Sequence, residues 1–180
     1  MSANPSSNKN TRNTESRFDQ AALSDSRLAS ADIDKVMKWI LKGKNFLVYL
    51  GVPGCGKTHF SKALFKYLSK DKSCFVRIWK EYDLLSRIRG SMSQHGDYID
   101  SLKYAVDDDY VILDDLGSTG VTEWRKEIIL EFIDMRYESQ KPTLITSNLS
   151  TNEIFEAYGK RAYSRLFCDE TTLLDFGTID

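Results

Sequence analysis

The sequence predicts an α/β domain built on a parallel β-sheet that is covered by helices on both faces. Short apolar segments of strand type alternate along the chain with amphipathic segments of helical period, as in sheets whose crossovers are helices. Three of the motifs that carry chemistry directly follow apolar strands, and open α/β sheets bind ligands at that edge. With 180 residues, the chain has the size of one domain. Its net charge is −1. The charge excludes a strongly basic, histone-like nucleic-acid binder.

The N-terminal segment differs in composition from the rest. Residues 1–30 contain seven Ser and four Asn and bury too little apolar surface to offset their ordering entropy. We therefore expect residues 1–30 to be largely disordered, with a possible partner-docking helix over 18–28, in which Phe18, Leu23 and Leu28 are the apolar side chains. The folded domain is expected over 31–180.

Three features predict a cytoplasmic protein with no membrane partner. No apolar run approaches the ~20 residues that cross a bilayer. The N-terminus lacks the apolar core of a secretory signal. Cys55, Cys74 and Cys168 are an odd number without metal-like spacing, so no disulfide framework is expected.

The first predicted helix begins near Ser30, which is a plausible N-cap, and stops at Gly43. Its apolar residues recur at i, i+3, i+4, i+7 and i+8. An apolar strand over Asn45–Leu50 follows, and then a glycine-rich loop leads into a helix over Thr58–Lys70.

The middle of the chain predicts a second strand over Cys74–Trp79. Two short helices are expected next, over Tyr82–Ile88 and Tyr98–Val106, separated by a polar loop over Arg89–Asp97.

The last third repeats the alternation of strand and helix. Ser150 and Glu153 form a capping-box pattern that opens one of its helices. The predicted elements are a strand over Tyr110–Leu113, a helix over Thr122–Glu138, a strand over Pro142–Thr146, a helix from Ser150 to about Tyr158, helical turns over Gly159–Phe167 and a strand over Thr172–Phe176.

The first chemical motif is a phosphate-binding loop that fits G-x-x-x-x-G-K-[ST] at every fixed position, between an apolar strand and an amphipathic helix. Backbone N–H groups and the helix N-terminus would surround phosphate oxygens. Lys57 would neutralise the β- and γ-phosphates, and the Thr58 hydroxyl would bind Mg²⁺. The predicted nucleotide-binding residues are Gly51, Val52, Pro53, Gly54, Cys55, Gly56, Lys57, Thr58 and His59.

The second and third motifs are polar groups at two strand ends. Asp114 and Asp115 follow an apolar strand, the Walker B pattern. Asp114 would hold Mg²⁺ opposite Thr58, and Asp115 would orient the attacking water. Asn148 follows another apolar strand, and its amide can both donate to and accept from that water; the alternative is a cap for the next helix, for which Ser150 competes.

The fourth motif is a pair of arginines, Arg161 and Arg165, which lie four residues apart on one helical face. In isolation such a pair is an ordinary solvated basic face. Beside the other three motifs it is a candidate source of an arginine finger.

The chain from Arg17 to Asp180 resembles the DnaC/DnaI helicase loaders and the IstB transposition ATPases, a branch of the AAA+ ATPases. Three stretches carry the likeness: GVPGCGKTHF, ILDDLGSTGVTEW, and DMRYESQKPTLITSNLSTNEI followed by YGKRAYSRL. The resemblance implies an AAA+ base domain with sheet order 5-1-4-3-2 and ATP-dependent self-association, with ATP between neighbouring subunits. It implies ATP hydrolysis, slow and stimulated by assembly or DNA.

The resemblance also assigns residues. Asn148 matches sensor 1, Arg165 matches the finger that reaches the next subunit's ATP, and Arg161 lies beside it. Arg136 is expected to face the same interface. Since the sequence stops at Asp180, no helical lid is expected after the last strand.

In this family single-stranded DNA is held by residues after the second strand. The matching residues here are Arg87, Arg89, His95 and Tyr98, which offer phosphate charge and a stacking surface. Arg77 and Lys80 extend this set. The alternative is an ordinary solvated helix end.

Several functions stay open at this point. The leading one is an ATP-hydrolysing switch that assembles on single-stranded DNA and loads a DnaB-type replicative helicase. The closest alternative keeps the ATPase and makes the partner a transposase. A small-molecule P-loop kinase and a nucleotide-binding adaptor that never hydrolyses ATP fit the paired aspartates, Asn148 and the two arginines less well.

Overall fold

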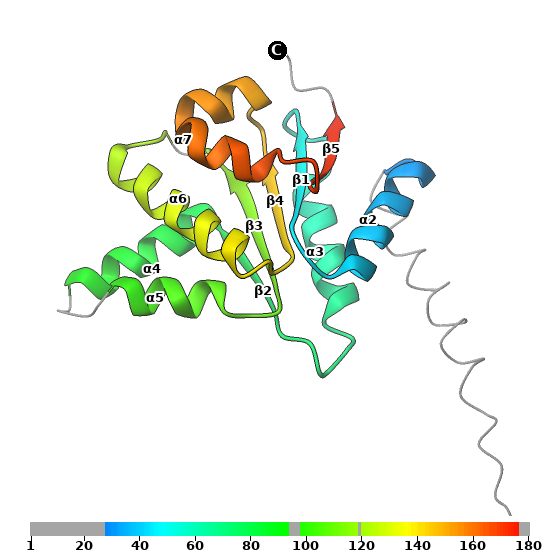
Figure 1. The fold of residues 1–180 in the computed structure, drawn as a ribbon, viewed down its shortest axis with the longest axis horizontal. Coiled ribbons are helices and arrows are strands. Elements are labelled where there is room, and N and C mark those ends of the chain that lie inside the picture. Colours follow the sequence, from blue (N-terminus) through cyan, green and yellow to red (C-terminus); the bar gives the residue numbers. More distant parts are fainter. Residues whose placement is uncertain (1–27, 94–97, 119, 177–180) are drawn as a thin grey trace, which may run out of the picture.

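The computed structural model describes residues 28–93, 98–118 and 120–176. A five-stranded sheet runs through the centre of the molecule with helices on both sides (Figure 1). The strand order is β2-β3-β4-β1-β5, and every neighbouring pair is parallel. Read from the other edge this is the order 5-1-4-3-2, so the predicted fold class and sheet order are both confirmed.

The strands are short and, in the middle of the sheet, apolar on both faces, as buried parallel strands are. They are β1 (Phe46–Gly51), β2 (Val76–Lys80), β3 (Tyr110–Leu116), β4 (Thr143–Ser147) and β5 (Thr172–Phe176). Because all five run in the same direction, their carboxyl ends meet at one edge of the sheet.

The helices form two layers, and each layer covers its own apolar core. They are α2 (Ser30–Lys42), α3 (Lys57–Leu68), α4 (Glu81–Ser93), α5 (Tyr98–Val106), α6 (Glu123–Glu138) and α7 (Thr151–Leu166). Leu47 and Tyr49 of β1 lie in a cluster with α2 and α3, whereas Phe46, Val48 and Leu50 lie in a cluster with α4 to α7. The alternation of side chains along the strand therefore supplies both cores.

Two helix ends follow the signals read from the sequence. Gly43 closes α2 with φ 62°, a left-handed conformation typical of the residue after a helix. At the start of α7, the Glu153 N–H donates to Ser150 Oγ, and the Ser150 N–H donates to Glu153 Oε2, which completes the predicted capping box. Gly159, with φ 82°, kinks α7 and separates the two helical segments that the sequence predicts there.

Some boundaries were predicted wrongly. Ala29, not Ser30, is the N-cap of α2. The strand β2 starts at Val76, because the Cys74 N–H still bonds back to the Asp71 carbonyl in a turn. The helix α4 continues to Ser93, so Arg89 is helical and not part of a loop.

Leu28, one of the three apolar side chains of the expected partner-docking helix, is buried in the α2–α3 core of this chain. The rest of the expected helix over 18–28 lies outside the described residues, as does most of the segment 1–30. Among the helices that are described, none has both the length and the apolar character needed to cross a bilayer.

The structure contradicts the expectation that Arg136 faces a subunit interface. This side chain is completely buried at the C-terminal end of α6. Its guanidinium donates to one hydroxyl and four backbone carbonyls, those of Thr143 Oγ1, Val106, Asp108, Asp109 and Pro142. Burial lowers the pKa of Arg136 to about 10, which still leaves it charged near neutral pH. Arg136 therefore stabilises the loops that lead into β3 and β4, at the amino-terminal edge of the sheet.

Candidate nucleotide-binding and hydrolysis site

The glycine-rich loop connects β1 to α3 at the carboxyl edge of the sheet (Figure 1). Gly56 is the N-cap of α3 with φ 105°, a conformation that side-chain-bearing residues rarely adopt. Lys57 begins the helix, is 7% exposed, and turns its ammonium back into the loop. There the ammonium donates to the Gly51 and Val52 carbonyls at 2.6 and 3.0 Å. The helix N-terminus and the Lys57 charge thus converge on the loop, which is the arrangement that binds phosphate.

Asp114 lies beside this loop in a network of three hydroxyl donors. Thr58 Oγ1 donates to its Oδ2 at 2.9 Å, and Ser61 Oγ and Thr146 Oγ1 donate to its Oδ1 at 2.7 and 2.8 Å. The carboxylate is 1% exposed. Hydroxyl and carboxylate oxygens are the hard ligands that Mg²⁺ prefers, and protein Mg²⁺ sites are commonly completed by nucleotide phosphates. The pair formed by Thr58 and Asp114 therefore fits the predicted magnesium site.

Asp115 lies next to Asp114 but has a different environment. It has φ 68°, a left-handed conformation, and its backbone N–H donates to Thr146 Oγ1 at 2.9 Å. Its carboxylate is only partly buried and accepts from Asn148 Nδ2 at 3.0 Å. The structure brings Asp115 and Asn148 together, as water-orienting roles for the two require. Non-glycine residues held at positive φ concentrate at functional sites.

An irregularity in the sheet explains why the two aspartates differ. The register between β3 and β4 pairs Leu113 with Ile145 and then Leu116 with Ser147. Between these two pairs β3 therefore has one more residue than β4. Such a bulge bends the strand and re-aims a side chain. Here the two extra-register residues are Asp114 and Asp115, so one carboxylate points to α3 and the other to Asn148.

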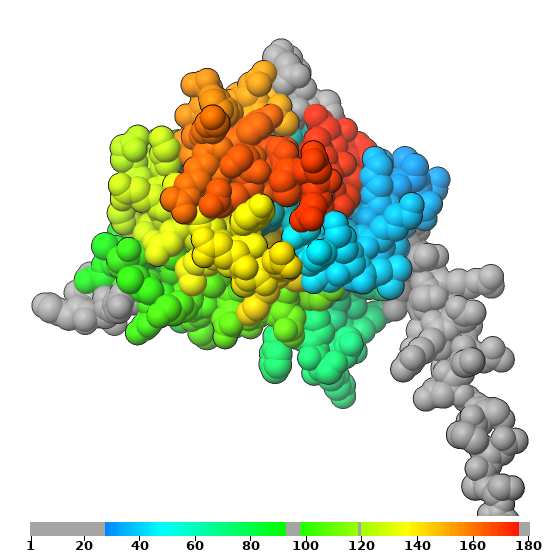
Figure 2. Space-filling view, in the orientation of Figure 1, coloured from blue at the N-terminus to red at the C-terminus, as the bar shows by residue number. Residues whose placement is uncertain are grey.

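Arg161 and Arg165 both lie on the second half of α7 and bind the same carboxylate of α6. Arg161 Nη2 lies 2.8 Å from Asp134 Oδ2, and Arg165 Nε is ion-paired with Asp134 Oδ1. The Arg165 guanidinium also stacks over the Tyr137 ring, 5.2 Å from its centroid. The two helices form one continuous surface in the space-filling view (Figure 2). Within the subunit, both arginines are therefore held in place by α6.

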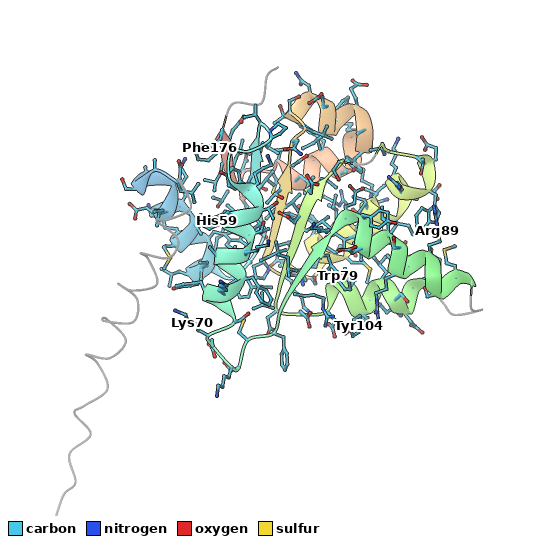
Figure 3. All side chains as sticks on the ribbon, turned by 180° about the vertical axis from the view of Figure 1, so that it is seen from behind. His59, Lys70, Trp79, Arg89, Tyr104 and Phe176 are labelled. Carbon is cyan, nitrogen blue, oxygen red and sulfur yellow. The ribbon has the colours of Figure 1, made fainter. Side chains whose placement is uncertain are left out.

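The predicted DNA-contacting residues lie around α4 and α5. The Arg87 guanidinium is 4.6 Å from the centroid of the Tyr104 ring, and Arg77 approaches the same ring at 4.1 Å. Arg89 stacks over Trp124 at 4.6 Å. Figure 3 shows Trp79, Tyr104 and Arg89 on this side of the molecule, well away from His59 on α3.

Not every member of that predicted set lies on the surface. Tyr98 is partly buried against the core, and His95 lies outside the described residues. An exposed aromatic side chain does lie among these arginines: Tyr104 is 49% exposed, and the guanidinium groups of Arg77 and Arg87 pack over its ring. Tyr104 was not among the predicted DNA contacts, because a tyrosine in a short amphipathic helix has no sequence signal that separates it from a core residue.

Two further hydroxyls, those of Ser61 and Thr146, hold Asp114 together with Thr58 and were not predicted from the sequence. Ser61 is fully buried on the inward face of α3, and Thr146 is fully buried in β4. A polar residue on an otherwise apolar helical face was the available signal for Ser61. Thr146 could be suspected from its place one residue before the end of a strand.

The loop, the paired aspartates and the sheet order together define a P-loop protein of the AAA+ class with an ATP-binding site. Residues 6–171 match the family model described as "IstB-like ATP binding protein", and the chain belongs to this family. It is 26% identical over 121 residues to the replicative helicase loader DnaC of Escherichia coli and 29% identical over 133 residues to the protein YqaM of Bacillus subtilis. These matches cover 66% and 68% of this chain. The chain spans only 49% and 42% of the length of these two relatives.

Solved structures with the same fold include helicase loaders and an initiator. The DnaC helicase loader superposes with a TM-score of 0.72 at 24% identity, covering 86% of this chain and 96% of that one. DnaI gives 0.67 at 20% identity, covering 88% and 93%. The replication initiator DnaA bound to AMPPCP and single-stranded DNA gives 0.72 at 16% identity, covering 88% and 50%. At these identities the likeness establishes the fold.

Proposed function

We propose that this protein is an ATP-hydrolysing switch that assembles on single-stranded DNA and loads a DnaB-type replicative helicase. The observation that carries the ATPase part of the proposal is that two adjacent carboxylates have different hydrogen-bond partners. Asp114 is buried against Thr58 and the phosphate-binding loop, whereas Asp115 is turned to Asn148. A binding module needs the first arrangement, but only hydrolysis makes use of the second.

The residues take the following roles in this proposal. The loop from Gly51 to Thr58 holds the ATP phosphates, and Lys57 neutralises them. Mg²⁺, held by Thr58 and Asp114, would offset the charge of the phosphates. Asp115 and Asn148 orient the attacking water, one as an acceptor and the other as a combined donor and acceptor.

Self-association supplies the remaining charge. Arg165, with Arg161 beside it, would reach the ATP held by a neighbouring subunit. Because Asp134 binds both arginines within the subunit, engaging a neighbour's phosphate requires Arg165 to exchange one anionic partner for another. An isolated subunit would then hydrolyse ATP slowly, and assembly would raise the rate.

Single-stranded DNA and the helicase are the proposed partners. The surface around Arg87, Arg89 and Tyr104 combines guanidinium charge with an exposed ring, which suits phosphate contact and base stacking. Relatives named as replicative helicase loaders support the helicase as the protein partner. We further propose that residues 31–180 are the ATPase core, that the segment before it contacts the partner, and that the protein works in the cytoplasm.

The family model itself supports one alternative, in which an IstB-like ATPase serves a transposase. Affinity capture separates the two. A hydrolysis-blocked Asp115→Asn subunit loaded with ATP is used as bait, with ADP-loaded bait as the control. ATP-dependent recovery of a DnaB-type helicase supports loading, and recovery of a transposase supports the alternative.

The ATPase proposal is tested by two matched substitutions. Lys57→Ala should abolish ATP binding, because the phosphates lose a cation buried in the loop. Asp115→Asn should leave ATP binding intact, since Asp114 and Thr58 remain, and should abolish turnover. Release of phosphate is measured together with the search for a phosphorylated small molecule, which a kinase would produce. Equal loss of binding in both variants would show that the two aspartates have been assigned wrongly.

A further inference from the structure

Glu81 is a buried carboxylate that the proposed ATPase mechanism does not yet use. It is the first residue of α4, directly after β2, and is 1% exposed. Burial raises the pKa of Glu81, while the Gly117 N–H and the Tyr158 hydroxyl act in the opposite direction by hydrogen bonding to the ionised form. Buried carboxylates are costly unless their oxygens are satisfied, so the identity of the partners is informative.

The first partner ties Glu81 to the segment that carries Asp115. The Gly117 N–H donates to Glu81 Oε2 at 2.7 Å. Gly117 has φ 79°, and a Cβ added there would lie 2.4 Å from Leu149 Cδ1, so this turn favours glycine. Asp115, two residues earlier, is itself left-handed. The Glu81 carboxylate therefore fixes the far end of the turn from which Asp115 projects.

The second partner ties Glu81 to the helix that carries the two arginines. The hydroxyl of Tyr158, a fully buried residue of α7, donates to Glu81 Oε1 at 3.3 Å. Tyr158 directly precedes Gly159, where α7 kinks. The half of α7 beyond the kink bears Arg161 and Arg165, so the Tyr158 bond anchors the point from which that half departs.

We propose that Glu81 is a positioning residue for ATP hydrolysis, because its single buried carboxylate joins the turn of Asp115 to the arginine-bearing half of α7. The inference rests on the proposed ATPase function. Its physical basis is that hydrolysis depends on small displacements of the water-orienting group, whereas phosphate binding by the loop does not involve this region. Since Glu81 also begins α4, a ligand that displaces α4 would act on both groups.

The test uses two substitutions, one that alters both hydrogen bonds of the Glu81 carboxylate and one that removes only the bond from Tyr158. Glu81→Gln keeps the size of the side chain, removes the charge, and leaves only one oxygen for two donors. Tyr158→Phe removes the hydroxyl bond and leaves the bond from Gly117. For each variant, kcat and the Kd for ATP are measured, and the Gly117 amide proton is followed by NMR as a direct report on the bond.

We expect Glu81→Gln to bind ATP within about threefold of wild type while kcat falls about 10- to 100-fold, the range expected when a reacting group is displaced by around 1 Å. The Gly117 amide proton should move upfield as its bond to a carboxylate is lost. Tyr158→Phe should keep the Gly117 signal and lose about three- to tenfold in kcat. A merely structural role would instead lower stability and leave kcat of the folded fraction unchanged.

Three results overturn the inference. One is a folded Glu81→Gln variant with wild-type kcat, and another is a parallel loss of ATP binding and turnover like that of Lys57→Ala. If Glu81→Gln does not fold, a wild-type kcat for Tyr158→Phe overturns it. Failure of the proposed function is distinct, because it appears as a wild-type chain that binds ATP and never hydrolyses it.

Discussion

Replacement of Arg136 by methionine tests whether this buried guanidinium stabilises the fold or contributes to a subunit interface. Methionine keeps an unbranched apolar stem and ends where the guanidinium begins, so the change removes the buried guanidinium and its hydrogen bonds. The lost bonds lead to five acceptors, of which the Thr143 hydroxyl and the Val106 and Pro142 carbonyls lie in buried surroundings. The other two, the Asp108 and Asp109 carbonyls, are partly buried and can bind water instead.

The expected loss of stability follows from the three buried acceptors. A hydrogen bond to a charged group contributes about 1.5–3 kcal/mol, and a buried acceptor left unsatisfied costs about 1–3 kcal/mol. The Val106 carbonyl loses its bond to the guanidinium, whereas the Pro142 carbonyl still accepts from the Val111 N–H and the Thr143 hydroxyl still donates to the Lys141 carbonyl. We therefore expect Arg136→Met to lower the free energy of unfolding by about 3–5 kcal/mol, or the melting temperature by roughly 6–20 °C for a chain of this size. Arg136→Lys keeps the charge and up to three donors, so its loss should be about half as large.

Urea unfolding followed by tryptophan fluorescence measures both variants, with ATP binding as a check on the remote site. The urea midpoint should fall with little change in slope. If Arg136→Met is within about 1 kcal/mol of wild type, below the cost of a single unsatisfied buried acceptor, the reasoning is refuted. Normal stability combined with loss of self-association would restore the interface role that the sequence suggested.

Three further outcomes are expected. Arg165→Ala should bind ATP normally but lose on the order of 10³-fold or more in turnover, and mixing it with Lys57→Ala subunits should restore activity; no recovery in mixtures that co-assemble would reject the finger. Arg87→Ala should weaken single-stranded DNA binding, measured by fluorescence anisotropy, and flatten the dependence of log K on log salt by about one ion, whereas an unchanged slope would remove this surface from the proposal. Because burial raises the pKa of Glu81 in the folded state, the ionised form is disfavoured there, and wild type should lose stability relative to Glu81→Gln as pH rises from the unfolded pKa of about 4.3 through the raised folded value. A stability difference that does not change with pH would contradict the last expectation.

Periodicity and the turn residues were enough to place every strand and helix between α2 and β5, because the central strands are buried and the crossovers are amphipathic. The boundaries failed where tertiary contacts decide them. Phe75 has a strand-type side chain, yet it is 69% exposed, and its N–H donates to the Asp109 side chain. The extension of α4 past Ile88 depends on packing against α5 and on the stacking of Arg89 over Trp124, neither of which is visible in a local window.

In the candidate site, too, some residues could be predicted from the sequence and others could not. The phosphate-binding loop, Asp114, Asp115 and Asn148 could be predicted, since parallel strands bring their carboxyl ends to one edge and polar residues at strand ends must then meet. Ser61 and Thr146 could not be assigned, because a buried hydroxyl has no sequence signature until its acceptor is placed. Arg136 shows the opposite error, because its place in the family pattern suggested an interface position, whereas its side chain is buried.

The orientation of Asp115 is the step at which local and distant causes combine. Its sequence position follows from the strand, but its direction follows from a bulge in the register between β3 and β4 and from a left-handed turn that ends at Gly117. That turn is held by Glu81, which is 36 residues away in the sequence. A motif search can therefore find the two adjacent aspartates, whereas what makes one a candidate metal ligand and the other a candidate water-orienting group is a contact between elements. For this reason substitutions at Glu81, which lies outside every motif in the sequence, and at Tyr158, whose hydroxyl no motif assigns a role, are expected to affect turnover while leaving ATP binding intact.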